Sequence, residues 1–209
     1  TKDAAILSGL KVLRLLNEPT AAAIAYGLES KKVSKVMVYD LGGGTFDISI
    51  LDLNDGVFKV LATGGDSSLG GDDFDHLLAD YIESKLELDL DKSVKNSLYL
   101  YAKEIKILLS DSESVNIDLK KIGLNDQVFT ISQDDFNSLI DSLVRKTLKI
   151  SENVLSDANL SIESIDEIIL VGGSTRTPYI RFMIESFFEK PPLFNICLLY
   201  TSDAADDTP

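Results

Sequence analysis

Two aspartates flanking a run of glycines are the residues in this sequence best suited to chemistry. Residues 36–53 read VMVYDLGGGTFDISILDL, in which Asp40 ends one apolar run and Asp47 opens the next. Such runs are typical of buried strands, so the glycines and Thr45 fall in a tight hairpin between them. Glycine reaches positive φ cheaply, and the N–H groups of such a turn form a concavity that holds anions. Two carboxylates would repel an anion unless a hydrated divalent cation lay between them, so we interpret this stretch as a magnesium–phosphate site.

An ordinary hairpin turn is the alternative, because most Gly-Gly pairs between apolar runs are only turns. The sequence contains neither the G-x-x-x-x-G-K-[ST] pattern of a P-loop nor a G-x-G-x-x-G dinucleotide fingerprint. Any nucleotide chemistry here would therefore use a β-hairpin and not a helix N-terminus.

Two further glycine-rich turns follow apolar runs, GGDSSLGG at 64–71 and VGGSTR at 171–176. Taken alone, the second is more often a βα turn with a solvent-exposed arginine. Its glycine pair would also allow flat packing against a purine or ribose, with neighbouring side chains that can hydrogen-bond or stack on it (Gly172, Gly173, Ser174, Arg176).

Several other polar residues have two interpretations each. Glu18 before Pro19 is either a favourable charge at a helix start or an acid that positions water or a metal ion. Lys106 and Ser110 lie one turn apart on a predicted helix face, which could clasp a ribose or base but also suits an exposed lysine. His76, the only histidine, falls on the polar side of a helical stripe, where we expect a solvated residue.

The bulk composition excludes several classes of protein. The 209 residues are 44% hydrophobic and 26% charged, which suits one large or two small globular domains. A net charge of −14 argues against a nucleic-acid or anionic-membrane surface. No apolar run approaches the roughly 20 residues of a membrane helix, and no signal peptide is present. The single Cys197 excludes intrachain disulfides and fits a reducing compartment, and the missing initiator Met suggests a start within a larger protein.

The apolar periodicity predicts alternating helices and strands. We expect an antiparallel meander of three strands, two short strands further on, and one buried strand before VGGSTR (36–40, 46–53, 57–62, 115–119, 128–131, 165–171). Helices are expected between them (1–28 with a break at Pro19, about 71–82, 93–110, 133–155, 178–188), with Ser132 as an N-cap. Residues 197–209 show no periodicity, and we expect this tail not to pack.

Four motifs in order resemble the nucleotide-binding domain of DnaK-type heat-shock chaperones. They are NEPTAAAIAYG at 17–27, YDLGGGTFDISIL at 39–51, LGGDDFD at 69–75 and VGGSTRTP at 171–178. The resemblance runs from residue 1 to about 196. Three further stretches are most similar to the HscA branch, the chaperones of iron–sulfur cluster assembly (LATGGDS at 61–67, DDFDHLLADYI at 72–82 and Pro-Pro-Leu at 191–193).

The resemblance implies an α/β fold of the actin-like ATPase (ribonuclease H-like) type, of which this chain would be mostly lobe II. Residues 1–35 would be the end of lobe I and a crossover helix, and residues 36–68 with 151–196 the core subdomain of lobe II. Residues 69–150 would be an inserted upper subdomain, and 197–209 a disordered tail outside the family pattern.

The resemblance also assigns roles in the site. Glu18 would position the attacking water, and Asp40 and Asp47 would hold Mg²⁺ and K⁺, all three mostly through water. The β- and γ-phosphates of ATP or ADP would meet the hairpin (Gly42, Gly43, Gly44, Thr45). The ribose and adenine would meet a second set (Gly71, Lys106, Ser110, Gly172, Gly173, Ser174, Arg176). Two departures are Lys103, where the family usually has a glutamate on the adenosine, and Ile107, where an arginine often stacks on the base.

The implied function is ATP hydrolysis coupled to client binding in a cytoplasmic chaperone. The implied partners are a J-domain co-chaperone, a nucleotide-exchange factor and a client, here an iron–sulfur scaffold protein, with no nucleic acid and no membrane. Because the family's first phosphate loop and catalytic lysine would precede residue 1, one alternative is a nucleotide-binding module without catalysis. A general DnaK folding chaperone is another alternative. A third, an actin-like filament, is disfavoured by the residues that make up the motifs.

Overall fold

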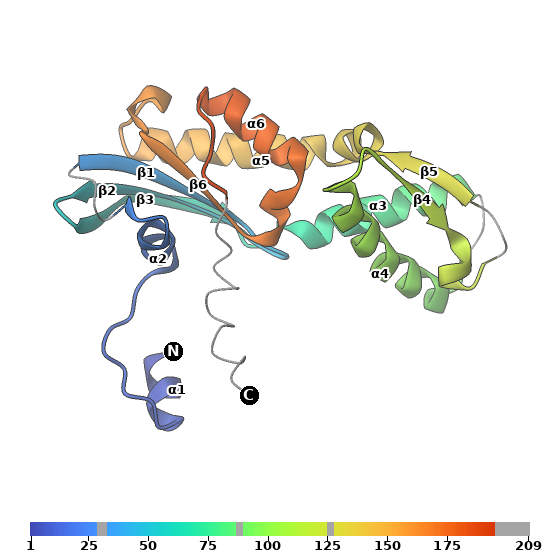
Figure 1. Cartoon of the computed structure of the whole chain (residues 1–209), viewed down its shortest axis with the longest axis horizontal. Helices are drawn as coiled ribbons and strands as arrows, with labels where there is room; N and C mark the ends of the chain where they lie inside the picture. The colour runs from blue at the N-terminus through green and yellow to red at the C-terminus, as the bar shows by residue number, and fades with distance from the viewer. Residues whose placement is uncertain (29–32, 87–89, 125–127, 195–209) are drawn as a thin grey trace.

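A computed structural model of the chain describes residues 1–28, 33–86, 90–124 and 128–194, and one sheet organises them (Figure 1). The strand order in this sheet is β3-β2-β1-β6. β1 (Val33–Leu41), β2 (Phe46–Asn54) and β3 (Val57–Asp66) form the antiparallel meander predicted from the sequence. β6 (Glu167–Val171) joins β1 in parallel, which brings the VGGSTR turn beside the end of β1.

The two faces of this sheet are covered unequally. Because side chains alternate along a strand, Met37 and Tyr39 of β1 face the main core, while Val36 and Val38 face the other side. The main core lies under α5 (Gln133–Asp157) and α6 (Pro178–Phe188), which lie above the sheet in Figure 1. The opposite face is covered by the short α2 (Glu18–Ala25).

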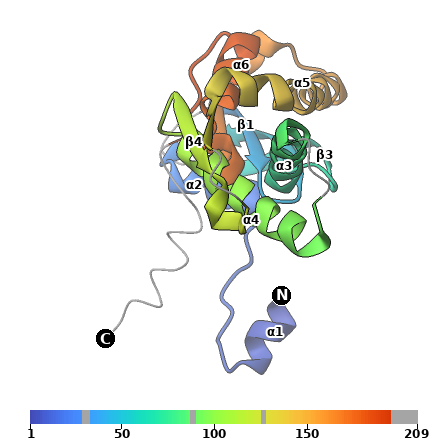
Figure 2. The ribbon, with the colours of Figure 1, turned by 90° about the vertical axis from the view of Figure 1, so that its right-hand side faces the viewer.

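A second unit lies beyond one end of the sheet, on the right in Figure 1 and facing the viewer in Figure 2. It contains α3 (Gly71–Leu86), α4 (Lys92–Leu109), β4 (Ser114–Asp118) and β5 (Val128–Ser132), with a short 3₁₀ helix at Leu119–Ile122. Gly123 ends this 3₁₀ helix in the left-handed conformation. α5 starts in this unit and runs back over the sheet, so one hydrophobic cluster is continuous through both.

Most predicted elements are confirmed with ends shifted by a few residues, and the start of α5 is a clear case. The side chain of Ser132 accepts from the Asp135 N–H while the Asp135 carboxylate accepts from the Ser132 N–H, which is a full capping box. α6 begins at Pro178 with Thr177 as its N-cap residue, as predicted.

The predicted helix over residues 1–28 is wrong between residues 8 and 17. The chain forms α1 (Lys2–Leu7), bends at Gly9 with φ of 80°, and is not helical again until Glu18. No residue of α1 is buried, and a six-residue helix without tertiary packing has little stability. Leu13, one of the leucines that favoured helix, is 87% exposed, and Leu16 is 48% exposed, so neither is buried in a core.

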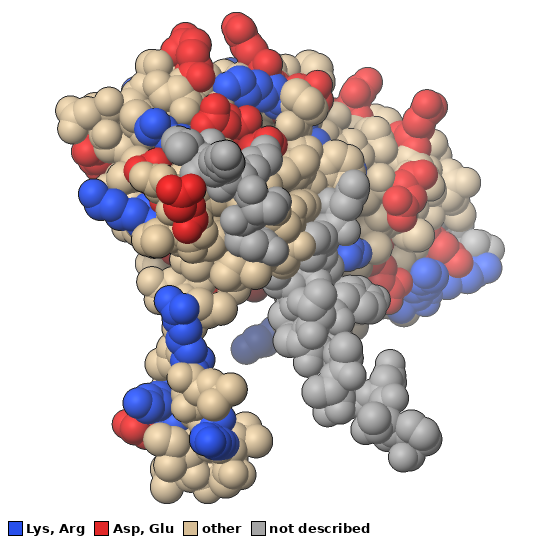
Figure 3. All heavy atoms as spheres, turned by 60° about the vertical axis from the view of Figure 1, so that its left-hand side comes forward, with Lys and Arg blue, Asp and Glu red and all other residues tan. Residues whose placement is uncertain are grey.

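Charges are mixed over the surface. Figure 3 shows acidic and basic side chains interspersed on one face, with the N-terminal segment projecting below. The sequence of this segment contains Lys2, Lys11 and Arg14. Within the described residues, no helix is both long enough and apolar enough to span a lipid bilayer.

Candidate functional site

The three glycine-rich turns meet at the carbonyl oxygen of Gly42. The hairpin between β1 and β2 closes when the Gly42 N–H donates to the Thr45 carbonyl, at 3.0 Å. The Gly42 carbonyl in turn accepts from the Gly71 N–H at 2.9 Å and from Ser174 Oγ at 2.8 Å. Next to it, the Asp72 N–H donates to the Gly43 carbonyl at 2.7 Å. Turns from three distant parts of the sequence therefore form one hydrogen-bonded unit.

The backbone segments approach one another so closely here that there is no room for side chains between them. A Cβ at Gly70 would lie 2.3 Å from the Gly43 carbonyl oxygen, and one at Gly65 would lie 2.3 Å from that of Phe46. Gly172 has φ of 89°, and a Cβ there would lie 2.2 Å from the Leu41 carbonyl oxygen. Gly70 and Gly172 are therefore needed for backbone contact between the loops, and Gly65 for the close pairing of β3 with β2.

Glu18, Asp40, Asp47 and Thr45 line one cavity of about 890 Å³. Asp40 lies directly opposite Asp47 in the antiparallel β1–β2 pair, and Glu18 reaches the cavity because α2 starts there, after an extended Asn17. Many of the other residues that line the cavity belong to the last part of β3 and the residue after it (63–67). The structure thus brings Glu18 into one cavity with Asp40 and Asp47, which lie 22 and 29 positions after it in the sequence.

The three carboxylates in this cavity repel one another when all are ionised and no cation lies between them. Burial raises the pKa of Asp40 to about 6, and the negative charges of Glu18 and Asp47 push it in the same direction. A cation in the cavity would relieve this repulsion. In the part of the chain that the structure describes, no group of three or more His, Cys, Asp or Glu side chains is close enough to ligate a metal directly. The three acids therefore suit a Mg²⁺ ion that keeps most of its water ligands, as Mg²⁺ usually does in proteins.

Of the residues predicted to meet the nucleoside, Lys106 and Ser174 lie next to Gly71. Lys106 Nζ lies 2.8 Å from Asp75 Oδ1 and donates to the Gly71 carbonyl at 2.9 Å. Ser110 Oγ donates back to the Lys106 carbonyl at 3.2 Å, so this pair does lie on one face of α4. In the VGGSTR turn Ser174 is buried against Gly42, whereas Gly173 and Arg176 are exposed.

Asp75 was not among the residues predicted for the site. It is fully buried in α3 and is the residue that meets the Lys106 ammonium group. The signal was present in the sequence, since Asp75 lies four positions after Gly71 and three before Leu78, on the buried side of the helix. A carboxylate on an apolar stripe indicates a buried partner.

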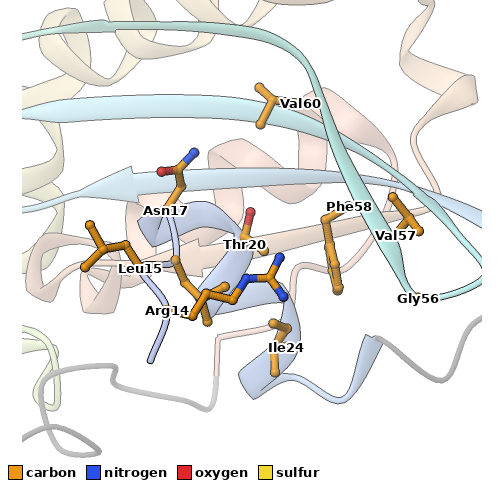
Figure 4. A pocket seen from close by; sticks show the side chains of 10 residues that line it. Arg14, Leu15, Asn17, Thr20, Ile24, Gly56, Val57, Phe58 and Val60 are labelled. Carbon is orange, nitrogen blue, oxygen red and sulfur yellow. The ribbon is translucent and has the colours of Figure 1, made fainter. Parts of the chain in front are cut away.

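His76 is exposed as predicted, although its ring stacks on Tyr99 with a centroid separation of 4.4 Å. A second cavity, of about 460 Å³, lies between α2, the segment before it and the β2–β3 turn (Figure 4). It is lined by Arg14, Thr20, Ile24, Phe58 and their neighbours and contains none of the predicted site residues. The chemistry therefore belongs to the larger cavity.

Comparison with known proteins identifies the family. The family model described as "Hsp70 protein" matches residues 1–197. The chain belongs to the Hsp70 family. The fold is that of the Hsp70 nucleotide-binding domain, the actin-like ATPase fold expected from the motifs.

The most similar relatives within Hsp70 include several HscA chaperones. The "Chaperone protein HscA homolog" of Aliivibrio salmonicida and the "Chaperone protein HscA" of Escherichia coli are each 54% identical over 198 residues, 94% of this chain and 31% of theirs. The homolog of Shewanella putrefaciens is 50% identical over 197 residues, 94% of this chain and 32% of its own. These matches support the HscA branch, and this Hsp70 chain spans about a third of the length of the curated relatives it matches.

Proposed function

We propose that this Hsp70 segment supplies one side of the ATP-hydrolysing site of an HscA-type chaperone. The observation that carries the proposal is the shared cavity, which is lined by Glu18, Asp40 and Asp47 together with Thr45 of the hairpin. A phosphate seated on this hairpin would meet backbone N–H groups, and a hydrated Mg²⁺ between the acids would balance its charge. Nothing in this arrangement requires a histidine or cysteine nucleophile.

Each residue has a role in the proposed reaction. The Gly42 N–H already closes the turn onto Thr45, so we propose that the N–H groups of Gly43, Gly44 and Thr45 bind the phosphates. Asp40 and Asp47 would hold waters of Mg²⁺ and of a monovalent cation, K⁺. Glu18, at the start of α2, would orient the attacking water against the terminal phosphate. Bound Mg²⁺ would supply charge stabilisation to the phosphate oxygens.

The nucleoside would lie beyond the phosphates, between the two structural units. We propose that it is bordered by one set of residues from the α3–α4 side and one from the turn after β6 (Gly71, Lys106, Ser110; Gly172, Gly173, Ser174, Arg176). This arrangement agrees with the proposed division into a lobe I end and crossover at 1–35, a lobe II core at 36–68 and 151–196, and an inserted subdomain at 69–150.

The proposal extends to partners through the HscA relatives. We propose that ATP turnover sets client affinity in a longer cytoplasmic protein, with a J-domain co-chaperone, a nucleotide-exchange factor and an iron–sulfur scaffold client. ATP turnover is measured with an iron–sulfur scaffold protein and, separately, with an unfolded general substrate. Stronger stimulation by the scaffold protein separates this branch from a general DnaK chaperone. Equal stimulation by both would favour the general chaperone.

The test uses a chimeric chaperone, in which this segment replaces the matching 198 residues of the Aliivibrio salmonicida relative. With Mg²⁺ the chimera should hydrolyse ATP, and Asp40→Asn and Glu18→Ala should each reduce turnover by about 10²-fold or more. Asp52→Asn, on the same strand as Asp47 but outside the cavity, is the matched control. Turnover that neither Asp40→Asn nor Glu18→Ala reduces would show that the acids are not catalytic.

A second proposal concerns the 209-residue chain by itself. Because the chain spans about a third of its relatives, we propose that alone it binds nucleotide without turning it over. Calorimetry with ADP and ATP in Mg²⁺ should then show binding, and a phosphate-release assay should show no hydrolysis. Measurable hydrolysis by the chain alone would contradict this second proposal and leave the first intact.

A further inference from the structure

Arg181 of α6 reaches back to the VGGSTR turn that follows β6. Its Nε donates to the Thr175 carbonyl at 3.2 Å, and its Nη2 donates to the Arg176 carbonyl. Helical side chains tilt toward the N-terminus of their helix, so an arginine in the first turn of α6 lies over the residues that precede it. Both carbonyls stand at the end of the 3₁₀ helix Gly173–Arg176, where backbone acceptors have no partner within the helix. Arg181 therefore closes the turn from its C-terminal side.

The guanidinium group of Arg181 is itself held by the segment after α6. Its Cζ lies 4.5 Å from the centroid of the Phe194 ring, and a guanidinium over an aromatic face is attracted to it. Phe194 follows Leu193, whose N–H donates to the Ile168 carbonyl at 2.7 Å and whose carbonyl accepts from the Leu170 N–H at 2.8 Å. Because a guanidinium is planar, it can stack on a ring and still donate in its own plane. Arg181 thus lies between an anchored ring and the turn.

The start of the same turn is fixed by other contacts. Ser174 Oγ donates to the Gly42 carbonyl at 2.8 Å. Gly172 lies so close to the Leu41 carbonyl oxygen that a Cβ there would be 2.2 Å from it. These contacts attach the N-terminal half of the turn to the phosphate hairpin. Removal of Arg181 would therefore release only the C-terminal half.

The side chain that projects from the C-terminal half is that of Arg176, which is exposed. An arginine side chain has many rotamers, and ordering it against a ligand costs conformational entropy. Holding the Arg176 carbonyl fixes the backbone from which this side chain projects and so reduces the freedom that is lost on binding. The hydrogen bonds of Arg181 therefore prepare Arg176 for a ligand.

We infer that Arg181 is a positioning residue, which holds the C-terminal half of the VGGSTR turn and through it places Arg176 for binding the nucleoside. The inference rests on the proposed function, since it concerns the nucleoside side of that site. It adds a residue that lies outside the four sequence motifs, and it connects the nucleoside side of the site to the chain after α6.

The structure offers a matched arginine on another helix. Arg145 of α5 donates from Nε to Asp141 Oδ2 at 2.8 Å, and its side chain is 65% exposed. The partner lies one turn earlier on the same helix, and such exposed pairs contribute little to stability. Arg145→Met therefore removes an arginine whose ion pair is local to α5 and serves as the control.

The experiment compares a ligand that carries a nucleoside with one that does not. In the chimeric chaperone, the affinities for ADP and for tripolyphosphate, both with Mg²⁺, are measured for Arg181→Met, Arg176→Ala and the double variant. We expect Arg181→Met to weaken ADP binding by about fivefold or more and to alter tripolyphosphate binding by less than about twofold, because the bond from Ser174 to Gly42 remains. The double variant should bind ADP no more weakly than Arg176→Ala, because Arg181 acts through Arg176. Arg145→Met should bind both ligands as the unmodified chimera does.

Thermal melting accompanies every measurement, because loss of the two hydrogen bonds also lowers stability. If Arg181→Met does not fold, Arg181→Lys replaces it, since lysine keeps the charge without the planar fork, and ADP binding should then weaken by at least about twofold. Unchanged ADP binding in the folded variant, equal losses for the two ligands, or a double variant weaker than Arg176→Ala would overturn the inference. Failure of the unmodified chimera to bind ADP or tripolyphosphate would instead count against the proposed function.

Discussion

Asp40 and Asp47 face each other across the β1–β2 pair, so the two carboxylates closest to the glycine hairpin extend from opposed backbone positions. Like charges directly opposite each other on neighbouring strands are destabilising. Burial and these neighbours raise the pKa of Asp40 from 3.8 to about 6. The arrangement of these acids therefore lowers the free energy of unfolding, and a bound cation would restore it.

Asp40→Asn should stabilise the chain in the absence of Mg²⁺. Because the pKa of Asp40 is higher in the folded state, that state binds more protons between about pH 4 and 6, and the free energy of unfolding falls as pH rises through this range. Asparagine removes this penalty, so we expect a gain of about 1–3 kcal/mol at pH 7.5 that fades toward pH 4. Urea unfolding in EDTA at several pH values measures it, with Asp52→Asn as the control. A gain that persists unchanged at pH 4 would contradict the explanation.

Gly70→Ala should disturb the phosphate hairpin more than its size suggests. The new Cβ would lie 2.3 Å from the Gly43 carbonyl oxygen and 2.6 Å from the Gly44 nitrogen, so backbone on one side must move. We expect ATP affinity in the chimera to fall by at least about tenfold. Ser68→Ala, in the same loop but exposed, is the control, and equal affinities for the two variants would show that the loops can separate without consequence.

Ser132→Ala tests the capping box that starts α5. The substitution removes the Ser132 hydroxyl, which accepts from the Asp135 N–H and donates to the Asp135 carboxylate, but it leaves the Ser132 N–H bonded to that carboxylate. Loss of the hydroxyl should lower the free energy of unfolding by about 1 kcal/mol. For a domain of this size that corresponds to roughly 2–4 °C in Tm. Ser138→Ala, within the same helix and exposed, should be neutral or slightly stabilising, since alanine is the better helix former. Equal losses at both serines would count against the capping box.

Tyr39 and Thr147 should respond unequally to removal of their hydrogen bond. The Tyr39 hydroxyl donates to Thr147 Oγ1 at 2.6 Å in the core, while Thr147 Oγ1 also donates to the Val144 carbonyl. Tyr39→Phe leaves Thr147 with a partner and should cost about 1 kcal/mol, whereas Thr147→Val leaves a buried hydroxyl without its acceptor and should cost about 1–3 kcal/mol. Denaturant unfolding measures both, and the reverse order would contradict this account.

The strands and the glycine loops could be predicted because their signals are local. Apolar runs on both sides of residues 42–45 predict the hairpin, and the Ser132 cap is encoded within four positions. The non-helical stretch at residues 8–17 could not be predicted in the same way, since the leucines there have helical propensity but all remain about half exposed or more. Asp75 was missed for a different reason, because its partner Lys106 lies 31 positions away and only the packing of α3 on α4 brings them together.

The residues of the site were predicted from motifs, but their connections were not. That Gly42 would accept hydrogen bonds from both Gly71 and Ser174 follows from the way three loops cross at the end of the sheet. Spacing in the sequence carries no information about such a crossing.

The short segment after α6 affects how readily the sheet could pair with a second molecule through the edge of β6. Leu193 pairs with the outer side of β6, where its N–H donates to Ile168 and its carbonyl accepts from Leu170. Pro191 and Pro192, just before it, have no N–H groups with which to extend the pairing to another chain. Leu193 therefore occupies the middle of the outer edge of β6, and a version of the chain ending at Lys190 would leave that edge open to pairing with another chain.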